Sequence, residues 1–208
     1  MTNYSTYVDW RRTFHQYPEL SDEEYETTEM LRKILKSYGI RILDVPLKTG
    51  LVAEIGQGEE MIAVRTDIDA LSIEEHVKHE FTSTHQGVMH ACGHDIHMAS
   101  ILATGTQLKE IEDELNGRVR LIFQPAEELG HGAFEIINTG VLKGAKAVLG
   151  FHNYPTLKVG EFAIKSGAIT SAVDRFEFHI QGKGAHAAKP EQGNDPVIVV
   201  GQLINSLQ

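Results

Sequence analysis

Cysteine and long apolar runs are both scarce in this chain of 208 residues. Cys92 is the only cysteine, so no disulfide can form within the chain and a small disulfide-stapled module is excluded. No run is apolar and long enough for a transmembrane helix, and residues 1–10 lack the basic region and apolar stretch of a secretory signal. These absences predict a cytoplasmic protein in a reducing compartment.

Positive charge is also in deficit. The chain has 19 Lys and Arg residues against 29 Asp and Glu residues, which gives a formal net charge of −10. This balance disfavours binding to the phosphates of nucleic acids or to an anionic membrane, so we expect neither partner. Histidine, in contrast, is abundant, with 11 residues.

Short apolar runs alternate with helical patterns through most of the chain. The runs typical of strands are 40–45, 51–55, 61–65, 119–123 and 147–151, and helices are expected at 6–17, 21–38, 94–108 and 132–139. Ser21 and Glu24 form the pattern of a capping box for the second helix, and Gly39 is placed to end it. Buried strands that alternate with helices predict an α/β fold, with a mixed, largely parallel sheet and helices on both faces.

The pattern changes after residue 152. Strands are expected at 158–164 and 173–180, where alternating apolar residues indicate a different sheet. Asp195 and Pro196 then form an N-cap and a first helical position. We therefore predict two domains, 1–171 and 172–208.

The segment 89–97, with the sequence MHACGHDIH, contains the densest cluster of reactive side chains. Cys92 and His94 lie where a polar loop meets the start of a helix, so both can reach one divalent ion. Two other interpretations stay open. Cys92 could be a buried free cysteine beside surface histidines, or a nucleophile with His94 or His97 as its base.

Polar side chains also follow three of the predicted strands. They are the aspartates of segment 65–69, the pair Glu127 and Glu128, and His152. In open α/β sheets ligands bind at the carboxyl ends of strands, so these side chains are expected to converge. Alone, the Glu pair could be two solvated charges that begin a helix, but the joint pattern favours a zinc or manganese site. Glu127 could then move a proton between water and a leaving amine.

Six motifs give the chain a resemblance to a known family. They are HQYPEL at 15–20, RTDIDAL at 65–71, MHACGHD at 89–95, QPAEE at 124–128, FHN at 151–153 and GAHAA at 184–188. Together they resemble the amidohydrolase branch of the dinuclear metallopeptidases. That branch includes hippurate hydrolase, N-acyl-amino-acid amidohydrolases, auxin-conjugate hydrolases and N-acetyldiaminopimelate deacetylase.

The resemblance implies a zinc-peptidase-like catalytic domain with two divalent metal ions per subunit, zinc or manganese. Cys92 would bridge both ions, His94 and His152 would complete one site, and Glu128 would serve the other. Glu127 would be the general base and then the general acid.

The same resemblance implies a homodimer. Residues 172–208 would be the first part of an inserted α+β dimerisation and lid domain. His186 would reach from this domain into the partner's active site to stabilise the oxyanion, although alone it could be a surface histidine. Asp69 would take the place of an aspartate that orients a ligand. Ser72 departs from the proline that the family usually has there, which affects a turn and not the chemistry.

The predicted function is metal-dependent hydrolysis of N-acyl amino acids, in which metal-bound hydroxide attacks the amide carbonyl. A metallo-carboxypeptidase or dipeptidase, a cysteine amidase and a non-catalytic metal-binding dimerisation fragment are the alternatives. Members of the family are longer than this chain and complete the second metal with a histidine near the carboxyl terminus. We therefore expect either a piece of a longer protein or a natural truncation, with weak or no activity by itself.

Overall fold

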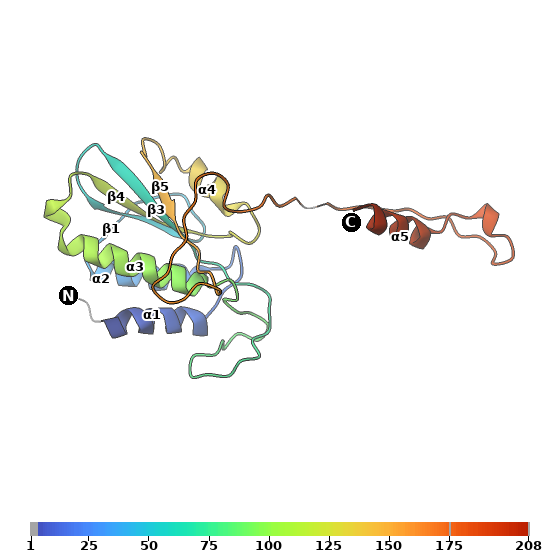
Figure 1. Ribbon diagram of the computed structural model, residues 1–208, viewed down its shortest axis with the longest axis horizontal. Coiled ribbons are helices and arrows are strands. Elements are labelled where there is room, and N and C mark those ends of the chain that lie inside the picture. The colour runs from blue at the N-terminus through green and yellow to red at the C-terminus, as the bar shows by residue number, and fades with distance from the viewer. Residues whose placement is uncertain (1–3, 175, 208) are drawn as a thin grey trace. The chain divides into compact units, whose positions relative to one another are not determined.

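The computed structural model describes residues 4–174 and 176–207 and divides the chain into two compact units, Met1–Leu157 and Lys158–Gln208 (Figure 1). The boundary predicted between residues 171 and 172 separates a catalytic domain from a dimerisation domain. It is a division by function, and it stays a prediction.

A five-stranded sheet with the order β1-β2-β4-β3-β5 forms the centre of the first unit. Its strands are β1 (Arg41–Ile42), β2 (Leu51–Gly56), β3 (Met61–Asp67), β4 (Arg118–Gln124) and β5 (Val148–Gly150). Strand β3 is parallel to both β4 and β5, whereas β2 is antiparallel to β1 and β4. The predicted mixed sheet is thus confirmed, and the carboxyl ends of β3, β4 and β5 lie at one edge.

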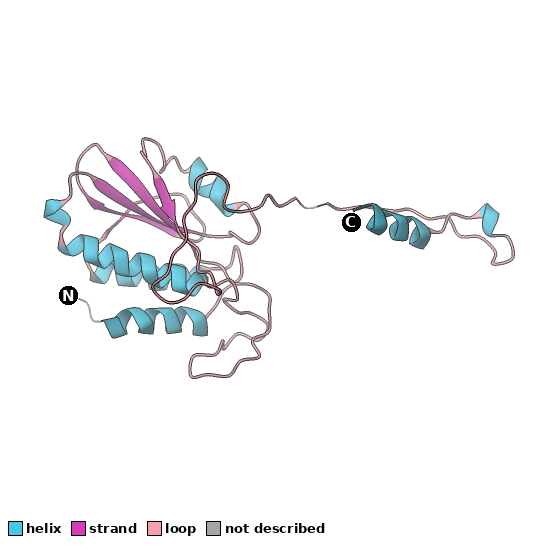
Figure 2. Cartoon of the chain, in the orientation of Figure 1, coloured by secondary structure: helices cyan, strands magenta, loops and turns pink. Residues whose placement is uncertain are grey.

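Helices cover both faces of this sheet (Figures 1 and 2). Helices α2 (Tyr25–Ser37) and α3 (His94–Glu110) pack on one face, with α1 (Tyr4–Gln16) against α3, and α4 (Gly132–Asn138) packs on the other face. Successive strand residues point to opposite faces, so Leu51 and Ala53 join the cluster with α2 and α3, whereas Val52 joins Ile136 of α4. Each fully buried Leu or Phe stabilises this layered core by about 1.5–3 kcal/mol.

Helix α2 begins later than predicted and has a different cap. It starts at Tyr25, and the side chain of Glu24 makes no capping hydrogen bond. The Glu19 carboxylate accepts the backbone N–H groups of Glu26 and Thr27 at 3.1 and 2.7 Å. The predicted capping box of Ser21 and Glu24 is therefore wrong, because a carboxylate from outside the motif satisfies the free N–H groups.

Strand β5 is present as predicted, but it is not buried. Val148 and Leu149 are each 53% exposed. The strand lies at the edge of the sheet and pairs with β3 on one side only. Its apolar sequence correctly predicted a strand, and the expectation of burial was wrong.

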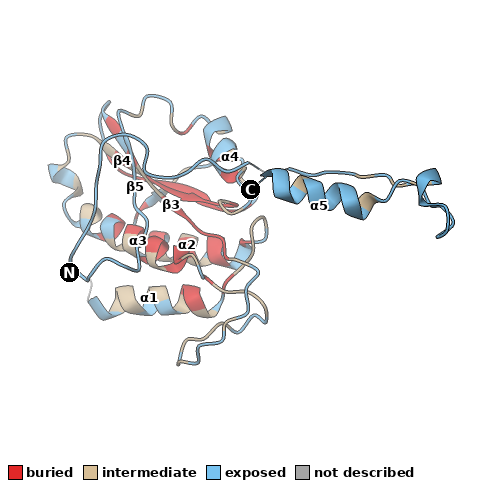
Figure 3. Cartoon of the chain, turned by 45° about the vertical axis from the view of Figure 1, so that its right-hand side comes forward, coloured by how far each residue is buried: buried red, intermediate tan, exposed pale blue. Residues whose placement is uncertain are grey.

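One helix of the second unit was predicted correctly from the sequence. Helix α5 (Pro196–Leu207) starts as predicted, because Asp195 Oδ1 accepts the backbone N–H of Val197 at 2.9 Å. No strand forms at 158–164. Arg175, within the expected strand 173–180, lies outside the described residues, and the rest of that segment is not a strand. None of the described residues of this unit is buried (Figure 3).

The helices of the described chain also lack the combination of length and apolar character that crossing a membrane requires.

Candidate metal centre

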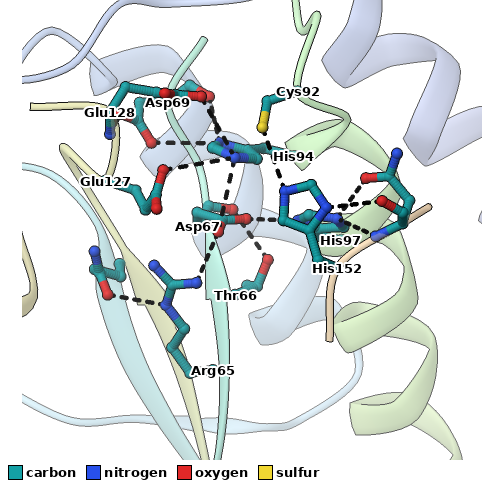
Figure 4. Close-up of polar contacts among 12 residues, drawn as sticks. Arg65, Thr66, Asp67, Asp69, Cys92, His94, His97, Glu127, Glu128 and His152 are labelled. Carbon is teal, nitrogen blue, oxygen red and sulfur yellow. Dashed lines mark hydrogen bonds and ion pairs between the residues drawn. The ribbon is translucent and has the colours of Figure 1, made fainter. Parts of the chain in front are cut away.

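The predicted metal-binding side chains come together where β3, β4 and β5 end and α3 begins (Figure 4). His94 is the first residue of α3, and Asp67 is the last residue of β3. Glu127 and Glu128 follow β4, and His152 follows β5. The strand-end argument from the sequence therefore placed these residues correctly.

His94 lies at the centre of the cluster. Its Nδ1–H donates to the carbonyl oxygen of Asp69 at 2.8 Å, which leaves Nε2 to face the site. Nε2 lies 3.7 Å from Asp67 Oδ2, 3.9 Å from Glu127 Oε2 and 3.8 Å from Glu128 Oε1. His94 Nε2 and Glu128 Oε1 are both buried, and neither atom makes a hydrogen bond. An imidazole nitrogen and three carboxylates that face one another fit a divalent cation.

Cys92 completes a second group around the same histidine. Its Sγ lies 3.3 Å from His152 Nε2, and that ring donates its Nδ1–H to the carbonyl oxygen of Asn153. Two groups of three residues bring their ligand atoms within 4.8 Å of one another. One group is Cys92, His94 and His152, and the other is His94, Glu127 and Glu128. The two groups meet at His94, whose Nε2 can bind one ion, and the remaining donors lie next to it.

The acidity of Cys92 depends strongly on these neighbours. Burial raises the pKa of its thiol to about 12, with further contributions from the carboxylates of Glu128 and Glu127. The thiol is therefore protonated at neutral pH in the metal-free chain. A divalent cation would favour the thiolate, which is the form that binds metal.

Glu127 combines partial access to solvent with a raised pKa. Its side chain is 39% exposed. Partial burial, followed by the charges of Asp67 and Glu128, raises the pKa of its carboxyl group above the usual value. A base with a pKa closer to neutrality transfers protons efficiently in both directions.

Asp69 forms hydrogen bonds with two of the candidate ligands, His94 and Glu128. Besides accepting from His94 through its carbonyl oxygen, it accepts the backbone N–H of Glu128 at 2.9 Å through Oδ2. Ser21 donates to the same carboxylate oxygen at 2.7 Å. These contacts are compatible with the orienting role predicted for Asp69.

Gly93 lets Cys92 and His94 face the same site. Its φ is +89°, a conformation that residues with a Cβ rarely adopt. A Cβ at this position would also overlap the side-chain amide of Asn153. Glycine is thus required both by the backbone angle and by the close approach of the segment after β5.

Asp67 lies in the cluster, as expected for the aspartates that follow β3, and it is joined there by His97, which the sequence suggested only as a base for a nucleophilic Cys92. His97 Nδ1–H donates to Asp67 Oδ1 at 2.7 Å, and its Nε2 accepts the backbone N–H of Asn153 at 3.0 Å. Burial opposes ionisation of Asp67, but the bond from His97 and the positive charges of His94 and Arg65 hold its pKa well below the usual range. The signals were the end of β3 and the spacing of three residues between His94 and His97.

His186 belongs to the second unit, where its Nδ1 accepts the backbone N–H of Ala188 at 3.1 Å in an exposed segment. Its action in a partner's active site stays a prediction.

Known hydrolases match this chain over nearly all of its length. N-acetyl-L-cysteine deacetylase of Bacillus subtilis (strain 168) is 52% identical over 200 residues, which cover 95% of this chain and 48% of that protein. N-acyl-L-amino acid amidohydrolase of Geobacillus stearothermophilus is 41% identical over 204 residues, 97% of this chain and 55% of that protein. The chain thus spans about half the length of the curated relatives it matches.

A solved structure and a family pattern agree with these relatives. The Bacillus subtilis YXEP protein, described as a dinuclear metal binding peptidase from the M20 family, is 49% identical with a TM-score of 0.76. The match covers 78% of this chain and 47% of that chain. The pattern of peptidase family M20/M25/M40 matches residues 63–205. The resemblance seen in the motifs is confirmed, and the chain belongs to peptidase family M20/M25/M40.

Proposed function

We propose that this chain provides the metal centre of an amidohydrolase that cleaves the amide bond of N-acyl amino acids. The observation that supports this most is the buried Nε2 of His94, which makes no hydrogen bond and faces three carboxylates next to Cys92 and His152. The names of the deacetylase and amidohydrolase relatives favour an acylated amino acid as the substrate.

Two divalent ions, zinc or manganese, are the proposed cofactors. Cys92 would bridge them, with His94 and His152 on one ion and Glu128 on the other. When bound, such ions polarise the substrate carbonyl and lower the pKa of water. Thiolate favours the softer zinc, whereas the carboxylates accept either metal.

Glu127 carries the proton in the proposed reaction. It takes a proton from water as the oxygen adds to the amide carbon, and it then gives this proton to the leaving nitrogen. The C–N bond breaks, and the products are a carboxylate and a free amino acid. The raised pKa of Glu127 suits both transfers, because the group must first accept and then release the same proton.

Asp69 and His186 have supporting roles in this proposal. Asp69 would hold His94 in the orientation that directs Nε2 to the metal. His186 of a second subunit would donate to the oxyanion of the tetrahedral intermediate, which makes a homodimer the active form. Under this proposal residues 1–171 form the catalytic domain and 172–208 belong to the dimerisation domain.

Replacing each glutamate separately tests the proposed roles. Glu127→Gln should abolish hydrolysis of N-acetyl and N-benzoyl amino acids while the metal content per chain, measured by elemental analysis, stays unchanged. Glu128→Gln is the matched control and should lose metal. Metal loss from Glu127→Gln with full occupancy in Glu128→Gln would show that the two roles are exchanged.

Peptidase activity at the same site is the second candidate, because the related YXEP structure is described as a peptidase. A peptide bond next to a free carboxylate has the same amide chemistry as an N-acyl amino acid. Comparing kcat/KM for N-acetyl amino acids and for dipeptides with the same carboxyl-terminal residue would separate the two. Higher values for dipeptides would favour the peptidase.

A further inference from the structure

The turn that carries Glu127 and Glu128 has a strained backbone. Ala126 has a φ of +47°, and among the described residues only Asp22 is another non-glycine residue with positive φ. Ala126 is also fully buried. A residue with a Cβ keeps this left-handed conformation only where surrounding contacts hold it.

A buried carboxylate supplies such a contact from a distant part of the chain. Glu24, which has no exposed surface, accepts the backbone N–H of Ala126 through Oε1 at 2.8 Å. Its other oxygen accepts the hydroxyl of Thr49 at 2.7 Å. Both of these partners are uncharged, so burial of the carboxylate opposes folding and raises the pKa of Glu24. Because burial of the Glu24 carboxylate lowers the stability of the fold, we expect this group to have a specific role at the strained turn.

The turn is held on both sides of Glu127. The N–H of Ala126 is bound by Glu24, and the N–H of Glu128 is bound by Asp69 Oδ2 at 2.9 Å. Between these anchors, Glu127 and Glu128 place their carboxylates 3.9 and 3.8 Å from His94 Nε2 (Figure 4). A change in the backbone at Ala126 would therefore redirect both carboxylates.

We propose that Glu24 is a positioning residue that holds Ala126 in its left-handed conformation and so directs Glu127 and Glu128 towards His94. Its consequence for catalysis rests on the proposed amidohydrolase function. The hydrogen bond and its effect on cation binding do not depend on that function.

Substitutions of Glu24 and of its two partners test this role in the 208-residue chain. Glu24→Ala should speed hydrogen exchange of the Ala126 amide about tenfold or more in the metal-free protein, relative to the core amide of Leu121. It should also weaken cobalt(II) binding, followed by visible absorption, by about tenfold. Glu24→Gln keeps an oxygen acceptor and should stay close to the unsubstituted protein in both measurements. Thr49→Val is the matched control, because it removes the other bond to Glu24 and leaves the Ala126 contact in place.

A compensating substitution separates positioning from general stability. Ala126→Gly, added to Glu24→Ala, should recover part of the cobalt affinity, because glycine adopts positive φ without steric cost. The cavity left by Glu24 remains in the double variant, so a purely structural effect would not be rescued. If Glu24→Ala does not fold, Glu24→Asp withdraws the acceptor by one methylene and should show the same changes to a smaller degree.

Two results would overturn the proposal. One is unchanged exchange at Ala126 when Glu24 is shortened or removed, and the other is an equal loss of cobalt affinity in Thr49→Val. Exchange and cobalt binding are measured without substrate, so their outcome does not depend on whether the amidohydrolase proposal holds.

Discussion

The raised pKa of Cys92 disfavours the alternative in which this residue is a nucleophile. Nucleophilic cysteines have a lowered pKa, whereas burial and the carboxylates of Glu128 and Glu127 raise the pKa of this thiol to about 12. We therefore expect Cys92→Asp to retain hydrolysis that a chelator abolishes, since a carboxylate can bridge two ions but cannot form a thioester. The assay is turnover with and without chelator. Complete loss of activity with full metal content would favour the cysteine amidase instead.

His15 makes a pH-dependent contribution to stability, away from the predicted catalytic residues. Its Nδ1 lies 2.8 Å from Asp95 Oδ2 and its Nε2 lies 3.1 Å from Glu75 Oε1. Burial lowers its pKa, but these two carboxylates outweigh burial and raise the pKa above 6.5. The charged ring thus stabilises the folded state fully below the unfolded pKa, and this contribution is lost as pH rises through the higher folded pKa.

Comparing His15→Gln with the unsubstituted chain isolates this contribution. The free energy of unfolding in urea, measured from about pH 6 to about pH 9, should differ most at the acidic end and converge towards the basic end. Parallel curves would show that folding does not shift the pKa of His15.

At the scale of elements, the junction before α3 depends on a glycine. Gly93→Ala should lower the free energy of unfolding by more than about 1–2 kcal/mol, because it adds a left-handed backbone penalty to the overlap with Asn153. It should also weaken metal binding, since Asn153 follows His152. Gly87→Ala is the control. Gly87 also has positive φ, of 73°, but the nearest atom to its added Cβ is Glu74 Oε2 at 3.9 Å.

Gly87→Ala should lose stability only because alanine disfavours positive φ, and it should keep its metal affinity. Chemical denaturation and a metal titration of both variants check the expectation. Equal metal affinity in the two variants would show that the approach of Asn153 does not position His152.

Elements whose signals are local could be predicted from the sequence. Apolar runs located β2 to β5, and Asp195 with Pro196 located the start of α5. Burial of β5 could not be predicted, because it depends on what covers the edge of the sheet. The cap by Glu19 was also missed, because its carboxylate reaches the helix from outside the capping-box spacing.

The candidate site was predictable where chemistry coincides with the ends of strands. Cys92, His94 and the Glu pair stood out because reactive side chains follow a loop or a strand directly. The hydrogen bonds that hold these residues in place could not be predicted from the sequence, because they join distant segments. Glu24 and Ala126, for example, are 102 residues apart in the sequence.

At the scale of the whole molecule, the two units differ in how much apolar surface they bury. The first has two clusters of buried side chains on opposite faces of its sheet. In the second, α5 leaves Val197 72% and Ile204 57% exposed, and none of the described residues is buried. Burial of apolar surface is the main source of folding stability, so the second unit should open far more readily.

Limited proteolysis and hydrogen exchange test this difference. We expect cleavage to begin within residues 158–208 and to leave a resistant fragment close to Met1–Leu157. Amides of α5 should exchange much faster than those of α3, because a helix with an uncovered apolar face has little tertiary stabilisation. Equal protection of the two helices at low protein concentration would contradict the expectation. Protection of α5 that rises with concentration would support the homodimer, because association of two chains would then cover the apolar face.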